Sequence, residues 1–199
     1  MAPGVEPAKI RHAVRQKFND VAILPNNRYR FRVGCELARD VGYPAELLAP
    51  LPATAAESFT GLAYLHPHLA LREGEQVLDL GCGAGLDTLV AARAVGPRGL
   101  VVGVDMADDM IAKARNNAVA AGITNARFAL AEAEALSVDD GVIDVAIVNG
   151  IFNLCPEKPA VAHELGRVLR PGGRAVVAEI TFSKALPPAT LQSSEDWFR

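Results

Sequence analysis

The chain has little cysteine, no long apolar segment and no secretory leader pattern. Its three cysteines in 199 residues are an odd and sparse set, which argues against a disulfide framework and suits a reducing compartment. No apolar run reaches the ~18 residues of a membrane helix. The N-terminus, M-A-P-G-V-E-P, lacks the basic and apolar regions of a secretory signal. We therefore expect a cytoplasmic protein without a membrane partner.

A strong charge of one sign is also missing. The formal net charge is −3, which gives no electrostatic basis for binding nucleic acid. Half of the residues are apolar, which is ample for one core, and 199 residues fit a single domain with a small appendage. No internal repeat is visible, so repeat architectures are not expected.

The most informative segment is V-L-D-L-G-C-G-A-G-L, at positions 77–86. Strand-forming residues run into three glycines at alternate positions, and a helix-forming run follows. A strand, a glycine turn and a helix form the front half of a nucleotide-binding βαβ unit. The dinucleotide pattern G-x-G-x-x-G would require a third glycine where Leu86 stands. Asp79, just before the glycines, would repel a pyrophosphate but suits a cofactor with a cationic amino-acid end. A glycine-rich turn of another kind of α/β protein is the alternative.

A second buried strand is predicted over 100–104, and Asp105 follows it, twenty residues after Gly85. An acid at the tip of this strand can accept hydrogen bonds from both hydroxyls of a ribose. This indicates a ribose but not which cofactor carries it. Because Asp108, Asp109 and a helical pattern follow, a role for Asp105 as a helix N-cap stays open.

The N-terminal third predicts short helices. Residues 7–21 carry apolar residues at helical spacing, which predicts one amphipathic helix. We expect its basic face to be solvated; this face comprises Lys9, Arg11, Arg15 and Lys17. Further helical pieces are expected over 35–40 and 44–48, whereas residues 50–70 show no clear periodicity. We interpret residues 1–70 as a helical cap segment in front of the main fold.

From Leu71 onwards, strand and helix patterns alternate. Helices are expected over 107–121 and 158–169, and a turn over 170–173. Further strands are expected at 126–130, 142–148 and 174–180. The alternation predicts an α/β fold with a doubly wound, mostly parallel sheet covered by helices on both faces. We assign residues 71–185 to this Rossmann-like domain and residues 186–199 to a tail.

Further motifs allow a family to be named. They are P-R-G at 97–99, G-V-D-M at 103–106, A-E-A-E-A-L at 131–136, N-G-I-F-N-L-C-P at 149–156 and V-L-R-P-G-G-R at 168–174. With the glycine loop, they resemble the class I S-adenosylmethionine-dependent methyltransferases, and within that class the arsenite methyltransferases and their relatives. The resemblance covers roughly residues 40–185. It implies a sheet that binds S-adenosylmethionine, with a small-molecule substrate held between the N-terminal cap and the strand tips.

The resemblance also implies a set of cofactor-binding residues: Asp79, Gly81, Cys82, Gly83, Gly85, Asp105, Met106, Glu132, Ala133 and Asn149. Asp79 would hold the methionine ammonium through solvent or backbone, and the glycines would leave room for the methionine and ribose. Cys82 lies in this loop, where we expect it to serve packing. Asn149, at the end of its strand, would face the methionine part of the cofactor.

The remaining residues of this set would hold the nucleoside. Asp105 would bind the ribose diol, and Met106 would pack on the adenine face. Glu132 would contact the adenine amine, and Ala133 would offer its backbone amide. Core packing for Met106 and a solvated surface position for Glu132 remain the alternatives.

The reaction implied by the resemblance is an in-line methyl transfer, for which a protein mainly aligns the reactants. A soft acceptor such as trivalent arsenic needs no general base, and neither a base constellation nor a metal site is indicated. Arsenite methyltransferases bind arsenic through thiolates. Cys155 and Cys35 are the candidate substrate thiols. Thr60 and Gly150 stand where relatives carry cysteine.

The chain departs from the class at its end as well. The class adds a helix and an antiparallel hairpin after the fifth strand, which needs roughly 35 residues, and the expected hairpin is not found in the sequence. We therefore expect a fragment or a reduced version of the fold. Three other functions stay open: a nicotinamide-dependent dehydrogenase, a non-catalytic S-adenosylmethionine-binding protein, and a methyltransferase for another small metabolite. Nothing in the sequence indicates an oligomeric state.

Overall fold

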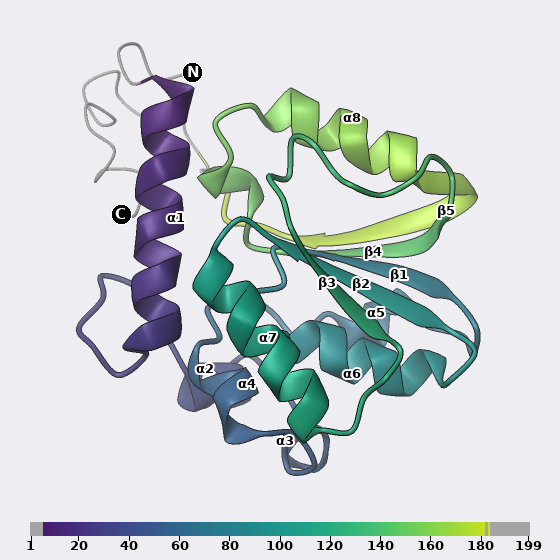
Figure 1. Ribbon diagram of the computed structural model, residues 1–199, viewed down its shortest axis with the longest axis horizontal. Helices are drawn as coiled ribbons and strands as arrows, with labels where there is room; N and C mark the ends of the chain where they lie inside the picture. Colours follow the sequence, from purple (N-terminus) through teal and green to yellow (C-terminus); the bar gives the residue numbers. More distant parts are fainter. Residues whose placement is uncertain (1–5, 182, 184–199) are drawn as a thin grey trace.

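A computed structural model describes residues 6–181 and 183, and the predicted tail lies outside these residues. Its core is a sheet of five parallel strands in the order β3-β2-β1-β4-β5 (Figure 1). The strands are β1 (Gln76–Leu80), β2 (Leu100–Asp105), β3 (Ala126–Leu130), β4 (Ile143–Asn149) and β5 (Leu169–Ala178). The predicted doubly wound parallel sheet is therefore confirmed. The strand order reverses between β1 and β4, and ligands of such sheets bind at the carboxyl ends of strands near this point.

Helices cover both faces of the sheet (Figure 1). Helices α6 (Leu86–Val95) and α7 (Asp108–Ala120) lie on one face, and α8 (Lys158–Val168) lies on the other. Strand β1 shows why both faces need cover. Its Val77 packs with the residues of α6, whereas Leu78 and Leu80 pack with those of α8. All three side chains are at most 1% exposed, which is typical of a parallel strand buried on both sides.

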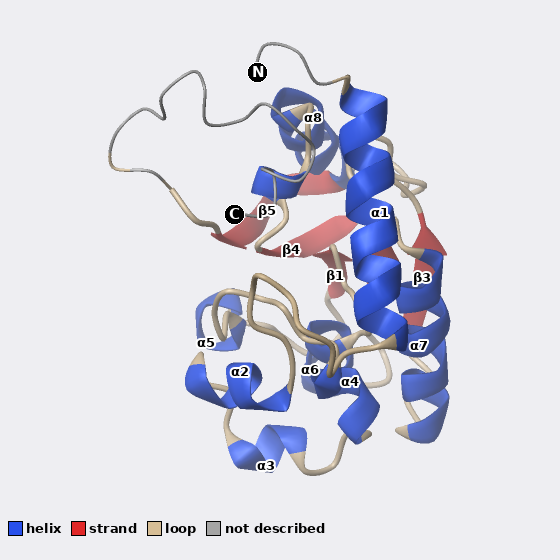
Figure 2. Ribbon diagram, turned by 90° about the vertical axis from the view of Figure 1, so that its left-hand side faces the viewer, coloured by secondary structure: helices blue, strands red, loops and turns tan. Residues whose placement is uncertain are grey.

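In the part of the chain that the structure describes, five helices precede the sheet: α1 (Pro7–Ile23), α2 (Cys35–Asp40), α3 (Ala45–Leu48), α4 (Ala53–Glu57) and α5 (His66–Leu69). Figure 2 shows α1 standing beside the strand ends, with α2 to α5 below them. The apolar stripe predicted for α1 is buried at Ile10, Val14 and Val21. Helices α4 and α5 were not predicted, because residues 50–70 show no clear periodicity in the sequence. Among the described residues, no helix is long and apolar enough to cross a bilayer.

A buried carboxylate attaches this N-terminal segment to the sheet. Asp87, in the first turn of α6, accepts hydrogen bonds from the Tyr43 hydroxyl, from His66 Nε2 at 2.9 Å and from Asn149 Nδ2 at 3.1 Å. Its donors thus come from the N-terminal segment and from the end of β4. Burial and the charge of Asp87 raise the pKa of Tyr43, which keeps this hydroxyl a donor. The contact was not predicted, because the residues that meet at Asp87 are separated from it by 21 to 62 positions in the sequence.

The turn predicted at 170–173 is instead an irregularity inside β5. Leu169 pairs with Ile143, and pairing resumes between Arg174 and Val145 after a shift of register. Gly172 takes φ 80° within this excursion, a conformation that glycine adopts without a Cβ penalty. The sequence P-G-G correctly predicts a bend in the chain. It does not show that the residues on both sides of the bend pair with β4.

Close packing around β2 leads to a test of the core. A Cβ built on Gly103 would lie 2.9 Å from Phe128 Cδ1 and from Thr88 Oγ1. We expect Gly103→Ala to lower the free energy of unfolding by about 1–3 kcal/mol, as overpacking does. Gly166→Ala in α8 is the matched control, because nothing lies within 4 Å of its added Cβ. The control should stabilise the protein by about 0.5–1 kcal/mol. Urea denaturation measures both, and equal effects would contradict the packing.

Candidate functional site

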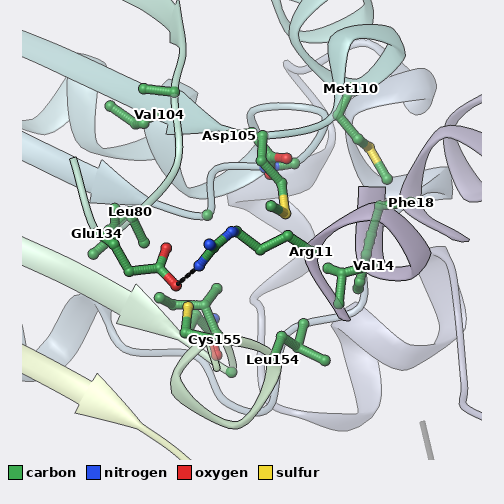
Figure 3. Close-up of a pocket in the computed structure, with 18 of the residues that line it drawn as sticks. Arg11, Val14, Phe18, Leu80, Val104, Asp105, Met110, Glu134, Leu154 and Cys155 are labelled. Carbon is green, nitrogen blue, oxygen red and sulfur yellow. Dashed lines mark hydrogen bonds and ion pairs between the residues drawn. The ribbon is translucent and has the colours of Figure 1, made fainter. Parts of the chain in front are cut away.

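An open pocket lies where the strands end, and it contains about 730 Å³ of empty space when its open mouth is counted (Figure 3). Its walls come from the tips of β1, β2, β3 and β4, from α1 and from the segment after β4. Of the predicted cofactor residues, those that line it are Gly81, Gly83, Asp105, Met106, Ala133 and Asn149. Asp79, Cys82, Gly85 and Glu132 are not part of this lining.

The three glycines of the loop have different structural roles. A Cβ on Gly83 would meet only Met110 Sδ, at 3.9 Å, so Gly83 leaves the pocket free. A Cβ on Gly81 would overlap Ile151 Cγ2 at 2.1 Å. A Cβ on Gly85 would lie 3.2 Å from Ala114 Cβ in α7, so this glycine allows the loop to pack against that helix. All three have positive φ, which favours glycine.

Asp105 joins the β2 tip to the glycine loop. Its Oδ2 accepts a hydrogen bond from Gly83 N at 2.9 Å, and its Oδ1 accepts one from Ala107 N at 2.9 Å. Helix α7 begins at Asp108 with Ala107 as its cap residue, so Asp105 is not the N-cap. Burial raises the pKa of Asp105 above its ordinary value, and the two backbone donors act against that shift. Each carboxylate oxygen keeps an acceptor site for a ligand hydroxyl.

Asp79 and Cys82 lie behind the loop. Asp79 is 2% exposed, and its Oδ2 accepts a hydrogen bond from Thr88 Oγ1 at 2.5 Å. Burial, then the charge of Asp87, raises the pKa of Asp79 to about 8. Cys82 is buried as well, and burial also raises its pKa. Cys82 therefore contributes packing behind the glycine loop, whereas Asp79 is protonated at neutral pH.

The tip of β3 carries two acids that α1 holds in place. Glu132 pairs with Arg11 Nε at 3.3 Å and with Arg15 at 3.4 Å. Glu134 lines the pocket and pairs with Arg11 at 3.5 Å, a contact drawn in Figure 3. The expectation of a solvated basic face is therefore wrong for Arg11 and Arg15. Their spacing of four residues put them on one side of a helix, but the sequence did not show which acids they would meet.

Another part of the pocket wall is apolar, and one thiol lies near Glu134. Its walls include Phe18, Ile151 and Leu154, and Cys155 contributes its sulfur (Figure 3). Burial, then the charge of Glu134, raises the pKa of Cys155 to about 12, so this thiol keeps its proton at neutral pH. Cys35 lies elsewhere, packed with the buried residues of α2, α4 and α6. The structure thus places one of the two candidate thiols in the pocket.

The two positions where relatives carry cysteine also line the pocket. Thr60 could be replaced by cysteine without a change of backbone conformation, because the two side chains are of similar size. Gly150 has φ 84°, and a Cβ there would lie 3.0 Å from Leu62 Cγ. A cysteine at 150 would therefore be strained in this backbone.

Asn149 uses its side chain to hold the N-terminal segment. Its Oδ1 accepts from Leu62 N at 2.8 Å and from Ala63 N at 3.3 Å, and its Nδ2 donates to Ala63 O at 2.9 Å. The amide expected to face a cofactor is thus engaged with the segment that carries Thr60. Asn149 still lines the pocket at the end of β4.

Comparison with known proteins agrees with this geometry. The profile of a family described as "Methyltransferase domain" matches residues 71–199. An arsenite methyltransferase of Halobacterium salinarum is 42% identical over 147 residues, which cover 74% of this chain and 37% of that protein. A demethylmenaquinone methyltransferase of Shouchella clausii is 38% identical over 110 residues, covering 55% and 46%. The chain spans less than half the length of both relatives.

A solved structure has the same architecture. The crystal structure of an arsenic(III) S-adenosylmethionine methyltransferase from Chlamydomonas reinhardtii superposes with a TM-score of 0.60 at 32% identity. The match covers 77% of this chain and 52% of that one.

Because Asp79 is protonated at neutral pH, we expect the stability of the protein to depend on pH. The pKa of Asp79 in the folded protein is about 8, above the ordinary 3.8. The stabilisation that comes from its bound proton is therefore complete below about pH 3.8 and is lost as the pH rises towards 8. Asp79→Asn cannot release this proton. We expect the free energy of unfolding of Asp79→Asn to increase relative to that of the wild type by up to about 1.4 kcal/mol per pH unit across this range.

Urea denaturation at several pH values measures this difference. Asp139→Asn, at an exposed position, is the control and should follow the wild type at every pH. A constant difference between Asp79→Asn and the wild type would show that Asp79 is ionised at neutral pH.

Proposed function

We propose, because the chain belongs to the methyltransferase domain family, that its pocket binds S-adenosylmethionine and that the protein transfers the cofactor's methyl group to a small molecule. The observation that carries this proposal is the position of Asp105. Its carboxylate lines the pocket while it fastens the glycine loop to the β2 tip. A ribose that contacts Asp105 would therefore be held against a loop whose shape Asp105 itself maintains.

The lining suits the parts of this cofactor. Gly83 leaves space next to Asp105 that any larger residue would reduce. Met106 and Ala133 line the pocket from the tips of β2 and β3, where they would contact the two sides of the adenine. Glu132 stands between Ala131 and Ala133, which both line the pocket, and from there its carboxylate would accept a hydrogen bond from the adenine amine. Gly81 and Asn149, at the tips of β1 and β4, would border the methionine part through their backbones.

When bound, S-adenosylmethionine supplies a methyl group activated by a cationic sulfur. The chain then has to place an acceptor in line with that methyl group and exclude water. No histidine or lysine lines the described pocket, His66 is engaged with Asp87, and the Glu134 carboxylate is paired with Arg11. This favours an acceptor that reacts without losing a proton to a basic side chain.

Trivalent arsenic is such an acceptor, and similarity to an arsenite methyltransferase supports it. Arsenic favours thiolate ligands, and Cys155 supplies one at the pocket wall. Its raised pKa opposes formation of the thiolate. We propose that arsenic would bind through Cys155 alone among the cysteines of this chain, with thiols from solution as its other ligands.

A carbon or oxygen acceptor is the second candidate. The walls contributed by Val14, Phe18 and Leu154 favour an apolar small molecule. The similarity to a demethylmenaquinone methyltransferase supports this class. Mass analysis of products formed from S-adenosylmethionine with arsenite plus thiol, or with a metabolite extract, separates the two. Cofactor binding without any methylated product would favour a non-catalytic binding protein.

Cofactor binding is the first test of the proposal. We expect S-adenosylmethionine and its demethylated product to bind with micromolar affinity, of order −8 kcal/mol. Asp105→Asn should weaken binding by about 1.5–3 kcal/mol, because charge-assisted hydrogen bonds to the ribose are lost. Asp139→Asn is the exposed control and should bind as the wild type does. Titration calorimetry measures all three.

The same titration separates the proposal from its alternatives. Folded wild type that binds neither ligand would refute the methyltransferase assignment. Heat with NADH instead would favour the dehydrogenase. Unchanged affinity in Asp105→Asn would remove the ribose role of Asp105 and leave the rest of the proposal standing.

The thiols give a separate test of arsenic as the acceptor. We expect Cys155→Ser to abolish arsenite binding and Cys35→Ser to leave it unchanged, since only Cys155 lines the pocket. The rate of arsenite binding by the wild type should rise with pH, because the thiolate is the nucleophile and the pKa of Cys155 is about 12. Thr60→Cys should raise affinity at least about tenfold by adding a second soft ligand. Equal loss in both serine variants would show that Cys35 reaches the arsenic.

A further inference from the structure

Two arginines of α1 contact the rim of the pocket at its nucleoside end. Arg11 contacts three acids: Glu132 through Nε at 3.3 Å, Glu134 at 3.5 Å and Glu157 at 2.9 Å. Its side chain is 21% exposed, well below that of an ordinary surface arginine. Figure 3 shows it reaching across the pocket from α1 towards Glu134. A guanidinium with several acidic partners is held in one orientation.

Arg15 lies one helical turn further and contacts both sides of the same end. Its Nε donates to Met106 O at the β2 tip, at 3.0 Å, and its other end pairs with Glu132 at the β3 tip, at 3.4 Å. The tips of β2 and β3 lie side by side in the sheet, and residues at both tips line the pocket. The spacing between these two tips is therefore linked to α1 through Arg15.

The remainder of α1 is fixed independently of these arginines. Val21 and Ala22 are buried, Lys113 Nζ donates to Ala22 O at 3.1 Å, and Asn19 donates to Asp108 at 2.9 Å. Loss of an arginine contact therefore need not detach the helix. This separates a local effect at the nucleoside end from unfolding of the N-terminal segment.

We propose that Arg11 and Arg15 are positioning residues that make the pocket select an amino-purine cofactor. This inference rests on the proposed function, since it assigns a partner to the Glu132 carboxylate. A carboxylate has about four acceptor sites, and the two arginines engage one on each oxygen. The oriented Glu132 would retain an acceptor for the exocyclic amine of adenine. A purine with a carbonyl at that position would instead face the carboxylate with like partial charge.

The charges around the arginines support this ligand class. Arg11 and Arg15 are matched by Glu132, Glu134 and Glu157, which leaves the cluster with an excess of one negative charge. Such a cluster does not attract a phosphate. A neutral base with a hydrogen-bond donor fits it, because the donor satisfies a carboxylate without adding charge.

The test compares two ligands that differ at one position of the purine. S-adenosylhomocysteine carries the amine, and S-inosylhomocysteine carries a carbonyl in its place. We expect the wild type to prefer the adenosyl ligand at least about tenfold, because the carbonyl leaves a charged acceptor unpaired. Arg11→Gln and Arg15→Gln should each reduce this preference severalfold, mainly by weakening the adenosyl ligand. Lys9→Gln, on the exposed face of α1, should keep both affinities.

Two further variants distinguish positioning from a general weakening of the pocket. Arg11→Lys should restore part of the preference, because it keeps the charge but not the planar fork. Glu132→Gln should remove the preference, and adding Arg11→Gln to it should cause no further loss of preference. Thermal unfolding of each variant by circular dichroism checks that it is folded at the assay temperature.

Each outcome of the titrations decides between explanations. An equal fall in affinity for both ligands, with the preference kept, would overturn the inference and make α1 a simple cover. An unchanged preference in both arginine variants would overturn it as well. A folded wild type that binds neither ligand would refute the proposed function itself, which keeps the two failures apart.

Discussion

The pocket depends on one carboxylate at the tip of β2. Asp105 accepts hydrogen bonds from Gly83 in the glycine loop and from Ala107 just before α7, so three chain segments meet at a single side chain. Because β1 and β2 are adjacent parallel strands, their carboxyl ends already lie side by side. The carboxylate then sets the shape of the turn between β1 and α6. Most other walls of the pocket are arranged around this fixed loop.

A second acid, Asp87, has the corresponding role for the N-terminal segment. It receives hydrogen bonds from Tyr43, His66 and Asn149, and Asn149 in turn binds the backbone of residues 62 and 63. The segment that carries Thr60 is thereby tied to the end of β4. The segment around Thr60 is therefore linked by hydrogen bonds to β4 and to α6, which directly follows the glycine loop, even though these residues lie far apart in the sequence.

The chemistry of the proposed acceptor side follows from burial. The apolar walls that would suit a small molecule also raise the pKa of Cys155 to about 12 and so oppose formation of the thiolate that a soft ion requires. The backbone at Gly150, with φ 84°, does not readily accept a cysteine as a further ligand. Sequence similarity to an arsenite methyltransferase therefore supports arsenic as the acceptor. The geometry of this pocket instead favours an apolar small molecule.

The sequence by itself determined the parallel sheet, the glycine loop and Asp105, because these follow from short-range patterns: apolar strands, glycines at alternate positions and an acid after the second strand. Tertiary structure decided the remainder. Gly85 has no Cβ because α7 lies against it, and the side chain of Asn149 is engaged by the N-terminal segment. Arg11 and Arg15 looked like a solvated helix face, and their pairing with Glu132 spans more than one hundred residues. Ion pairs over such separations depend on how α1 packs against the sheet, and no local pattern encodes that.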